Sequence, residues 1–390
     1  MKILMINVVC GIRSTGCICT NLAEELEKQG HQVKIAYGRE EVPPKYQKWA
    51  IRIGSNLDVG LHGIKARFFD AVGLGSKKAT KRFVEWMKEY DPDVIHLHNL
   101  HGYYINIEVL FDYLRNCGKK IIWTLHDCWA FTGHCTYFDY ENCEKWKMAC
   151  EKCPKSNDYP KRWVMDNSRK NYNLKKKILT QIPNMRIITP SQWLTNLVKQ
   201  SFLKEYAVQV IYNGIDTTIF KPTDSELRKK YNLEDKKVIL GVSAVWEKRK
   251  GLDVFNELAD MLPNDYRIVL IGIPRSLKKK LAKNIIAIPR TNNQKELAEF
   301  YTMADVYLNP TYEDNYPTTN LEAIACGTPV ITYNTGGSGE SAILYGCVVN
   351  EKNVDSIRAG IGNIRDFTIN GKVFDIKEMV EEYIKAYFYM

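Results

Sequence analysis

Short apolar runs and segments of helical periodicity alternate along the chain. Residues 1–9 form an apolar run that predicts a buried strand, and residues 20–29 carry apolar side chains on one face of a helix. Gly30 suits the end of that helix, and residues 33–37 alternate as a second strand does. A strand, a helix and a second strand in this order predict a parallel sheet with helices packed on it.

The same alternation continues through the chain as two successive series. Further strands are predicted at residues 94–98, 121–126, 186–189, 208–212, 238–242, 268–271, 285–288, 306–308 and 330–333. Turn residues at 213–216 and the nearby Pro222 separate the two series. Residues 377–388 then place apolar side chains along one side of a final helix.

These two series predict an α/β protein with two Rossmann-like, doubly wound parallel-sheet domains that face each other across a cleft. We place the N-terminal domain at residues 1–205 and the C-terminal domain at residues 206–372. Residues 373–390 are expected to form a C-terminal helix that packs back on the N-terminal domain. In such sheets, ligands bind beyond the carboxyl ends of the strands.

Length and composition are those of a folded protein with two domains. The 390 residues are 45% hydrophobic and 26% charged, which excludes a disordered chain and a small disulfide-stapled scaffold. No apolar stretch near the N-terminus approaches the roughly 20 residues of a membrane span, and we identify no signal peptide before Cys10. We therefore expect a cytoplasmic protein.

Positive charge is unevenly distributed along the sequence. Residues 1–200 contain 31 Lys and Arg against 20 Asp and Glu, whereas residues 201–390 contain 24 against 25. The excess in the first half is either an ordinary solvated surface or a sign of an anionic partner. Nucleic acid, a membrane surface and a phosphorylated substrate are the candidates for that partner.

A glycine loop, Gly11-x4-Gly16, follows the first strand and precedes a helix. A phosphate-binding P-loop would continue with Lys and Ser or Thr, but Cys17 and Ile18 stand there. The dinucleotide motif Gly-x-Gly-x-x-Gly is also absent, so ATP hydrolysis and nicotinamide chemistry lack their main sequence support. The loop is either a plain tight turn or a place where backbone N–H groups approach an anion.

A basic run, Lys248-Arg249-Lys250-Gly251, lies between the predicted strand 238–242 and a predicted helix at residues 252–262. The run is either a solvated turn or a functional cluster. At the carboxyl edge of a parallel sheet, two or three such cations could neutralise a diphosphate.

The segment 312–330 carries the densest set of candidate functional residues. A loop opens a helix at about Thr318, whose free N–H groups and positive dipole end would face the crevice. Asp314 lies in the loop and Glu322 on the helix, so one carboxylate can reach a reacting group and the other a distal hydroxyl. A second strand-to-helix loop, at residues 334–340, contains the pair Gly336-Gly337. Core packing does not require this combination, so we interpret the segment as a binding site.

Together these motifs resemble a family 4 retaining glycosyltransferase of the GT-B fold, over essentially the whole chain. Within that family the chain is most similar to enzymes that build bacterial capsule, exopolysaccharide or lipopolysaccharide repeat units. The segments that carry the resemblance are the Gly16 loop, residues 93–98, 123–127 and 213–216, Lys250-Gly251, the Asp314 and Glu322 segment, and Gly336-Gly337 with Glu340.

The resemblance implies a role for each candidate residue. The catalytic residues would be His126, Lys250 and Asp314. The residues that bind substrate would be Gly16, Arg249, Gly272, Arg290, Glu313, Asn315, Thr318, Thr319 and Glu322. Glu322 would hold the ribose hydroxyls of a nucleotide-sugar, while Lys250 and the backbone at the helix start would hold its diphosphate. The base would lie near Gly272 and Arg290, and the transferred sugar near Asp314, Asn315, His126 and the Gly16 loop.

The chain departs from the family pattern at two positions. The family's acidic motif is Glu-x7-Glu, whereas Asp314 stands at the first position with Glu313 just before it, so that either can fill the role. The family also has an arginine six residues before the lysine, where this chain has Ala244. Arg249 substitutes for that arginine, or the diphosphate is held by one cation fewer.

The function implied is transfer of a sugar from a nucleotide-diphosphate sugar, with UDP favoured over GDP, to a lipid-linked or growing surface-polysaccharide acceptor. The enzyme would work at the cytoplasmic face of the inner membrane and need no cofactor for catalysis, because fixed cations and a helix N-terminus can stabilise the leaving diphosphate. Two alternatives stay open: an epimerase or phosphorylase of the same fold, and a nucleic-acid-binding protein with a zinc tract. The second leaves the 312–340 region without function, so we expect no nucleic-acid partner.

The chain also contains 11 cysteines, five of which lie between residues 128 and 153. The spacing Cys135-x7-Cys143-x6-Cys150-x2-Cys153 suits a tetrahedral structural zinc site. The alternative is a set of buried thiols or disulfides. A zinc ion would fold an insertion at residues 128–160, directly after His126.

Overall fold

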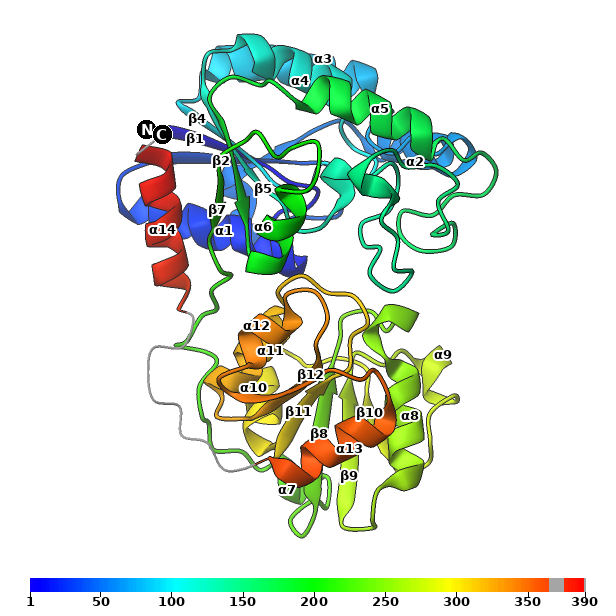
Figure 1. Cartoon of the computed structure of the whole chain (residues 1–390). Coiled ribbons are helices and arrows are strands. Elements are labelled where there is room, and N and C mark those ends of the chain that lie inside the picture. The colour runs from blue at the N-terminus through cyan, green and yellow to red at the C-terminus, as the bar shows by residue number, and fades with distance from the viewer. Residues whose placement is uncertain (365–374, 389–390) are drawn as a thin grey trace. The chain divides into compact units, whose positions relative to one another are not determined.

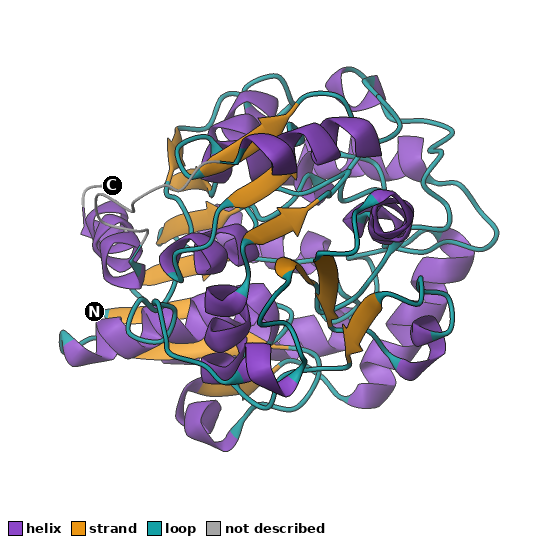
Figure 2. Cartoon of the chain, turned by 90° about the horizontal axis from the view of Figure 1, so that it is seen from below, coloured by secondary structure: helices purple, strands orange, loops and turns teal. Residues whose placement is uncertain are grey.

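Each of the two predicted series of strands forms its own parallel sheet with helices packed around it (Figures 1 and 2). The computed structural model describes residues 1–364 and 375–388. The chain divides into an N-terminal unit, Met1–Tyr212 with Met379–Met390, and a C-terminal unit, Asn213–Glu378. The prediction of two doubly wound α/β domains is confirmed.

The N-terminal unit is built on a seven-stranded sheet with the order β3-β2-β1-β4-β5-β6-β7, in which every described pair of neighbours is parallel. Its strands are β1 (Lys2–Ile6), β2 (Gln32–Tyr37), β3 (Ala50–Arg52), β4 (Val94–Leu97), β5 (Lys120–Thr124), β6 (Met185–Thr189) and β7 (Val208–Val210). Its α-helices before the domain boundary are α1 (Arg13–Lys28), α2 (Asn56–Phe69), α3 (Lys77–Tyr90), α4 (Ile107–Asn116), α5 (Ser168–Leu179) and α6 (Gln192–Val198). Short 3-10 helices lie at η1 (Pro44–Trp49), η2 (Trp129–Phe131) and η3 (Lys145–Lys147).

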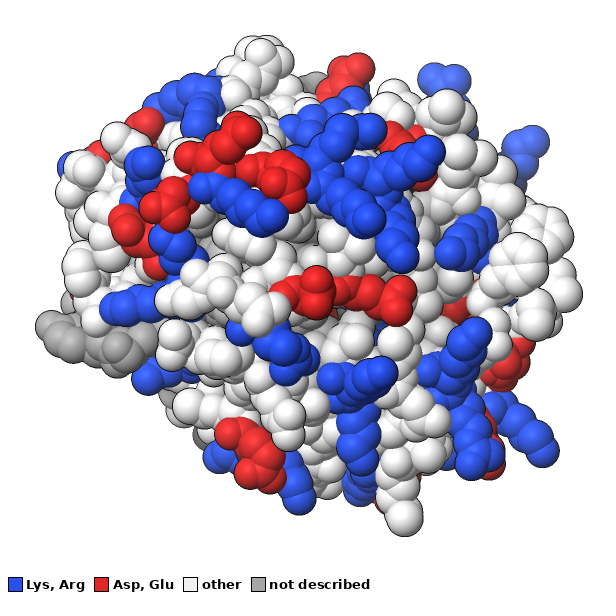
Figure 3. Space-filling view, turned by 90° about the horizontal axis from the view of Figure 1, so that it is seen from above, with Lys and Arg blue, Asp and Glu red and all other residues white. Residues whose placement is uncertain are grey.

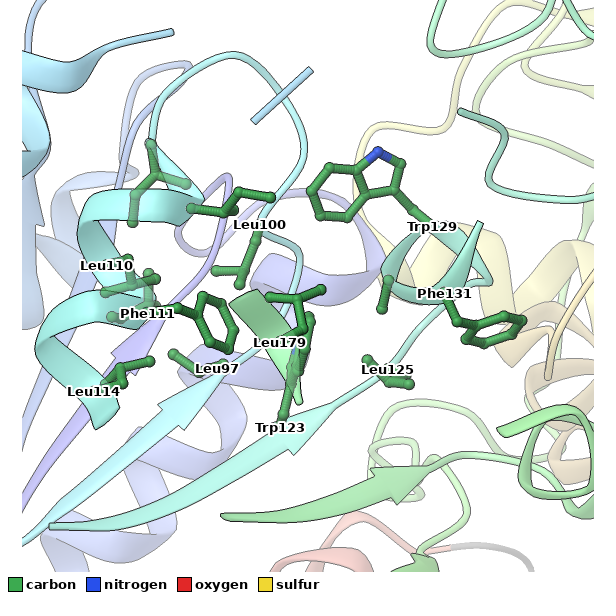
Figure 4. Packing of buried hydrophobic residues seen from close by; sticks show 14 of the residues in the cluster. Leu97, Leu100, Leu110, Phe111, Leu114, Trp123, Leu125, Trp129, Phe131 and Leu179 are labelled. Carbon is green, nitrogen blue, oxygen red and sulfur yellow. The ribbon is translucent and has the colours of Figure 1, made fainter. Parts of the chain in front are cut away.

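The core of this unit lies between the sheet and its helices because the central strands are apolar on both faces. Figure 4 shows Phe111 of α4 packing toward Leu97 of β4 and Trp123 of β5. The Phe111 and Trp123 ring centroids are 5.3 Å apart, and both side chains are fully buried. Burying each such side chain contributes about 1.5–3 kcal/mol, so these contacts fix the sheet that carries the loops after β4 and β5.

The C-terminal unit has a six-stranded parallel sheet with the order β10-β9-β8-β11-β12-β13. Its strands are β8 (Lys237–Val242), β9 (Tyr266–Ile271), β10 (Ile285–Ile288), β11 (Val306–Asn309), β12 (Val330–Tyr333) and β13 (Gly346–Val349). Its helices are α7 (Leu227–Lys230), η4 (Lys248–Lys250), α8 (Leu252–Met261), α9 (Arg275–Lys278), α10 (Gln294–Met303), α11 (Thr318–Ala325), α12 (Ser338–Ala342) and α13 (Val354–Asn363). The strand order reverses direction between β8 and β11, as it does between β1 and β4 in the N-terminal unit. Such switch points are where open α/β sheets bind ligands.

The last helix, α14 (Ile376–Phe388), is assigned largely to the N-terminal unit. The Tyr387 hydroxyl is 2.7 Å from His96 Nδ1 on β4, and the Tyr383 hydroxyl is 3.1 Å from Thr124 Oγ1 on β5. Both tyrosines are buried, so the helix extends the core of that unit. Of the segment predicted as helical, residues 373–374 and 389–390 lie outside the described residues.

The first helix and the domain boundary differ from the sequence prediction. Helix α1 begins at Arg13 rather than Thr20, so Gly16 lies inside the helix and not in the preceding turn. The Gly11 N–H donates to the Gly16 carbonyl at 3.2 Å, which joins the loop to the first turns of the helix. The boundary falls after Tyr212 rather than at 205/206, because β7 pairs with β6 and thus completes the first sheet. The short strands β3 and β13 were not predicted.

Candidate active site

The predicted donor-binding residues of the C-terminal unit all follow the carboxyl ends of strands. Arg290 follows β10, Gly272 follows β9, the basic run follows β8, Asp314 follows β11 and Gly336 follows β12. Because the strands are parallel, these five loops lie along one edge of the sheet. The two loops that flank the switch point, after β8 and β11, are joined directly.

An ion pair between Lys250 and Asp314 joins those two loops. Lys250 Nζ donates to Asp314 Oδ2, and the two side chains are only 19% and 13% exposed. Arg249 Nη1 donates to the Glu313 carbonyl at 3.2 Å, and the Tyr312 N–H donates to the Arg249 carbonyl at 2.7 Å. The basic run and the acidic loop therefore form one hydrogen-bonded structure.

The charge of Asp314 is maintained although its carboxyl group is buried. Burial acts to raise its pKa, but the positive charges of Lys250 and Arg249 and hydrogen bonds from Lys250 and the Asn315 N–H outweigh burial. The pKa of Asp314 is consequently below its ordinary value. Of the two adjacent acidic residues, Asp314 makes the ion pair with Lys250, while the Glu313 side chain is buried, at 2% exposure.

Two glycines let neighbouring backbone segments approach the Asp314 loop. Gly251 has φ 68°, and a Cβ added there would lie 2.3 Å from the carbonyl oxygen of Pro310. Gly336 has φ 57°, and its added Cβ would lie 1.8 Å from the carbonyl oxygen of Asp314. Any other side chain would displace one of these backbones, so the glycines are required where they stand.

Helix α11 starts four residues after Asp314, at Thr318, as predicted. The first N–H groups of a helix lack partners within it, and its N-terminus carries a partial positive charge. Buried Asn320 fixes the start of the helix: its side-chain oxygen accepts from Asn309 Nδ2 at 2.8 Å, and its Nδ2 donates to Ser341 Oγ at 2.9 Å. Helix α11 is thus tied to both β11 and α12, and its N-terminus can bind an anion.

Glu322 lies one turn into α11. Its Oε2 accepts a hydrogen bond from the Tyr301 hydroxyl at 2.8 Å. Burial raises the pKa of Glu322 to about 7, although hydrogen bonds from Tyr301 and Thr318 oppose this shift. Around neutral pH this carboxyl group can therefore accept or donate a hydrogen bond to a ligand hydroxyl. Tyr301 is a partner that the sequence did not reveal, because it lies on a different helix, α10.

Gly272 and Arg290 are placed apart from the ion pair. Gly272 has φ 89° and packs on the residue after β8, where an added Cβ would lie 1.7 Å from the Ser243 carbonyl oxygen. Arg290 is exposed and follows β10, the edge strand of the sheet. Within the described residues, no hydrogen bond or ion pair joins either of them to the Asp314 loop. The structure brings together the residues predicted to bind the diphosphate and the hydroxyl groups. The two residues predicted to lie near the base are not joined to them in the described part of the chain.

In the N-terminal unit, half-buried His126 follows β5 and forms a cluster with the buried His96 of β4 and the buried His98 that follows it. His126 Nε2 lies 3.0 Å from His98 Nδ1, and the rings of His98 and His96 lie against each other, tilted by 37°, with centroids 4.0 Å apart. His96 in turn contacts Tyr387 of α14 and, at 2.8 Å, Thr124 Oγ1. Burial, opposed by the charge of Asp127, lowers the pKa of His126 to about 4, and burial lowers that of His96 to about 3. These imidazoles are neutral at pH 7.

Gly16, the other candidate in this unit, lies on α1 just after the loop that follows β1. A Cβ added to Gly16 would lie 3.0 Å from Val9 Cγ2, so the glycine allows α1 to pack closely on that loop. This position is beside the β1–β4 switch point, although Gly16 is not part of a phosphate-binding turn.

The four cysteines of the predicted zinc site, Cys135, Cys143, Cys150 and Cys153, all pack into the insertion after His126, and the zinc ion itself stays a prediction. In the part of the chain that the structure describes, no three His, Cys, Asp or Glu side chains gather as metal ligands. Instead, the Cys135 and Cys153 thiols hydrogen-bond to each other. The insertion has its own core, in which Trp146 lies 5.4 Å from Phe131 and 5.0 Å from Phe138 between ring centroids. A buried His134–Asp70 contact of 2.5 Å ties it to α2, so packing holds the insertion together.

Comparisons with known proteins agree with this arrangement. Residues 18–219 match the model of "Glycosyltransferase Family 4", and residues 223–365 match that of "Glycosyl transferases group 1". The protein therefore belongs to the family 4 glycosyltransferases, which use nucleotide-sugars as donors.

Individual relatives and solved structures extend the comparison to nearly the whole chain. The chain is 24% identical over 360 residues to an Escherichia coli K12 protein named as a candidate colanic acid biosynthesis glycosyl transferase, WcaC, covering 87% of this chain and 85% of that protein. Sucrose-phosphate synthase from Thermosynechococcus elongatus matches with a TM-score of 0.73 at 17% identity, over 99% of this chain and 98% of that one. Anabaena HepE in complex with UDP matches with a TM-score of 0.68 at 12% identity, over 100% of both chains. These matches confirm the two-domain GT-B fold.

Proposed function

We propose that the protein is a retaining glycosyltransferase that transfers a sugar from a UDP-sugar to a lipid-linked or growing surface-polysaccharide acceptor. The observation that carries this proposal is the Lys250–Asp314 ion pair beside the open N-terminus of α11, with Glu322 one turn further on. This arrangement provides a cation and backbone N–H groups for a diphosphate and a carboxyl group for ribose hydroxyls.

The leaving group determines what this site must do. When the bond from the sugar to the diphosphate breaks, negative charge develops on the β-phosphate. Lys250, Arg249 and the first N–H groups of α11, at Thr318 and Thr319, are proposed to stabilise that charge. Since these groups are fixed before the reaction, they need little reorganisation as the charge develops.

Asp314 is proposed to position Lys250 before the donor binds and to contact the transferred sugar afterwards, together with Asn315. The ion pair holds the lysine side chain in position before a donor binds. In the N-terminal unit, His126 is proposed to hydrogen-bond a sugar hydroxyl. With a pKa of about 4, His126 offers a neutral imidazole that suits a hydroxyl better than a phosphate.

UDP is proposed as the nucleotide because HepE, which has the same fold, was solved with UDP and with UDP-glucose. A surface polysaccharide is proposed as the product because the relatives include proteins named for colanic acid and O-antigen biosynthesis. The second of these is 28% identical over 141 residues, which is 34% of this chain and 39% of that protein from Escherichia coli.

A thermal-shift panel of UDP, GDP and dTDP and their sugars tests the donor assignment. A ligand at 100 times its Kd adds about 2.7 kcal/mol to the free energy of unfolding. We expect UDP and one UDP-sugar to raise the melting temperature, and Glu322→Ala to reduce that increase. A response to GDP alone would replace UDP in the proposal, and no response to any nucleotide would contradict it.

Incubation of the identified donor with membrane extracts that contain lipid-linked oligosaccharides tests the reaction. Transfer of labelled sugar to lipid, with the donor's anomeric configuration kept in the product, is the expected result. Conversion of the donor to another nucleotide-sugar without an acceptor would identify an epimerase. Sugar phosphate release that depends on inorganic phosphate would identify a phosphorylase.

A further inference from the structure

Helix α2 turns its large apolar side chains outward. Leu57, Leu61, Ile64 and Phe68 are 71%, 59%, 53% and 40% exposed, respectively. They recur at intervals of four, three and four residues, which places them in one stripe along the helix. On a helix whose role was only to cover the sheet, these side chains would face the core.

The inner face of α2 explains why the stripe is not needed for packing. Gly63 and Ala66 are buried there, with His62 beside them. His62 Nδ1 lies 3.0 Å from Ser76 Oγ, and its Nε2 accepts from the Gly75 N–H at 3.0 Å. The helix therefore docks through small residues and polar contacts. No described packing contact accounts for the outer stripe.

Residues 163–165 extend the stripe into a continuous surface. The Trp163 N–H donates to the Arg67 carbonyl at 2.7 Å, and the Met165 N–H donates to the Phe68 carbonyl at 3.0 Å. The Phe68 and Trp163 rings meet edge to face with centroids 5.4 Å apart. We call this surface the α2 patch, and its members are Leu57, Leu61, Ile64, Phe68, Phe69, Trp163, Val164 and Met165, all at least 40% exposed.

Positive charge borders the α2 patch. The exposed cations on its two segments and just before α2 are Arg52, Lys65 and Lys161, and half-buried Arg67 lies with them. The acidic residues there are already engaged: Asp58 caps α2 through Ser55, and Asp166 and Arg162 neutralise each other in an ion pair of 3.0 Å. Figure 3 shows further Lys and Arg side chains gathering on the face that α3 and α5 cover in Figure 1.

The overall charge of the two units also agrees with a positively charged N-terminal surface. The N-terminal unit contains 33 Lys and Arg against 23 Asp and Glu, whereas the C-terminal unit contains 22 against 22. The whole excess of positive charge is thus in the unit that carries the α2 patch. An apolar patch bordered by cations complements a surface that is apolar inside and anionic outside, as a bilayer with acidic lipids is.

We propose that the α2 patch inserts into the surface of an anionic lipid bilayer, with α2 lying parallel to the membrane plane. Leu, Phe and Trp side chains enter the boundary between headgroups and acyl chains, and the bordering Lys and Arg side chains contact lipid phosphates. Within residues 1–364 and 375–388, no helix is long and apolar enough to cross a membrane. Membrane binding through this surface adds to the proposed function. It rests on that function in one point, which is that the acceptor is lipid-linked.

A second copy of the chain is the other occupant that an exposed apolar patch can have. In a twofold dimer the same patch faces itself, so the bordering cations of one copy would meet those of the other. Like charges placed opposite each other oppose association. Charge complementarity therefore favours the bilayer over a dimer.

Sedimentation of the full chain with vesicles tests the proposal. We expect binding to vesicles of phosphatidylcholine mixed with phosphatidylglycerol, weaker binding to phosphatidylcholine alone, and loss of the difference at high salt. Leu61→Ser and Ile64→Ser should each weaken binding about tenfold, since losing one buried aliphatic side chain costs at least that factor. Leu344→Ser, in the C-terminal unit at a residue 77% exposed, is the matched control and should bind as the parent does.

Three results would overturn the bilayer proposal: no vesicle binding, equal binding by the Leu61→Ser variant, or a dimer that Leu61→Ser dissociates in the absence of lipid. Because Leu61 and Ile64 are exposed, their replacement should leave the fold intact, which the melting temperature checks. Donor turnover without lipid separates this surface from the proposed function. Turnover without vesicle binding would refute the surface alone, whereas vesicle binding without turnover on any nucleotide-sugar would refute the function alone.

Discussion

The candidate sites of the two units use opposite electrostatics. At the carboxyl edge of the C-terminal sheet, Lys250 and Asp314 are charged, and a helix N-terminus adds partial positive charge. At the corresponding edge of the N-terminal sheet, His96 and His98 are buried and His126 is half-buried, and all three have lowered pKa values, so that they are neutral at pH 7. One site is suited to phosphate and the other to hydroxyl groups.

Burial has the same direction of effect in both sites, and the neighbours decide the outcome. Burial disfavours the charged form of any group, and a fixed opposite charge or hydrogen bonds to the charged form oppose that effect. Asp314 has Lys250 and keeps its charge, whereas Glu322 has only hydroxyl partners and its pKa rises to about 7. Both units have doubly wound sheets, so the fold does not decide which site is charged. The side chains that surround each titratable group decide it.

We expect the largest effect from removing the cation of the charged site. Lys250→Ala should lower turnover on the order of 10²–10³-fold, as loss of one preorganised electrostatic group does. Donor affinity should fall less, because the lysine acts most strongly as the leaving group gains charge. Steady-state kinetics give both values, and exposed Lys248→Ala is the control that should retain parental turnover. A Lys250→Ala enzyme with parental turnover would refute the assignment.

Glu322 and His126 should change the free energy of unfolding in opposite directions as the pH rises. Glu322 has a folded pKa of about 7 against an ordinary value of 4.5, so its contribution is fully present below pH 4.5 and is lost as pH rises through 7. The loss is up to about 3 kcal/mol at 1.36 kcal/mol per unit. Glu322→Gln should remove this loss, so the variant gains stability over the parent across that window.

His126 should behave in the reverse way. Its folded pKa of about 4 lies below the ordinary 6.5, so its contribution is present above pH 6.5 and is lost as pH falls through 4. His126→Gln should therefore flatten the acid side of the stability profile. Urea unfolding of the parent and both variants from pH 4 to pH 8 measures the two slopes. If the free energy of unfolding of both variants changed with pH in the same way, the opposite contributions expected of Glu322 and His126 would be contradicted.

A smaller effect is expected when the carboxyl group of Glu322 is removed. Glu322→Ala should weaken donor binding by roughly 1.5–3 kcal/mol, the range for a hydrogen bond to a charged group. Calorimetric titration with UDP measures the change, and Glu299→Ala, on neighbouring α10, serves as the control. Unchanged affinity in a folded Glu322→Ala protein would remove Glu322 from the proposed ribose site.

Much of the charged site could be predicted from the sequence because its parts are local. The residues from Asp314 to Glu322 lie within nine positions, and a helix start after a strand and loop is a short-range pattern. The fold class followed in the same way from the alternation of strands and helices. The start of α1 did not, because the contact between Gly11 and Gly16 that sets it involves backbone groups and leaves no hydrophobic pattern.

The neutral site could be predicted only in part, because its partners come from distant segments. His96 meets Tyr387 across 291 positions. In the charged site, the Tyr301 partner of Glu322 was missed for the same reason, since it lies on another helix. The spacing of the four cysteines likewise could not show the aromatic packing around Trp146 in the same insertion, because its partners Phe131 and Phe138 lie outside any cysteine motif.

The smallest expected effect tests whether helix α14 positions the neutral site. Tyr387→Phe removes the hydroxyl that His96 Nδ1 contacts and leaves that buried nitrogen without its partner, at a cost of about 1–3 kcal/mol in stability. Because the His96 ring lies against that of His98 and His98 contacts His126, the loss should also shift the NMR signals and the pKa of His126. Tyr206→Phe is the control, since its hydroxyl donates to the Leu179 carbonyl and accepts from the Ile182 N–H in the same unit, away from the histidines. A similar loss of stability in both variants, with His126 unchanged in both, would make Tyr387 a packing residue only.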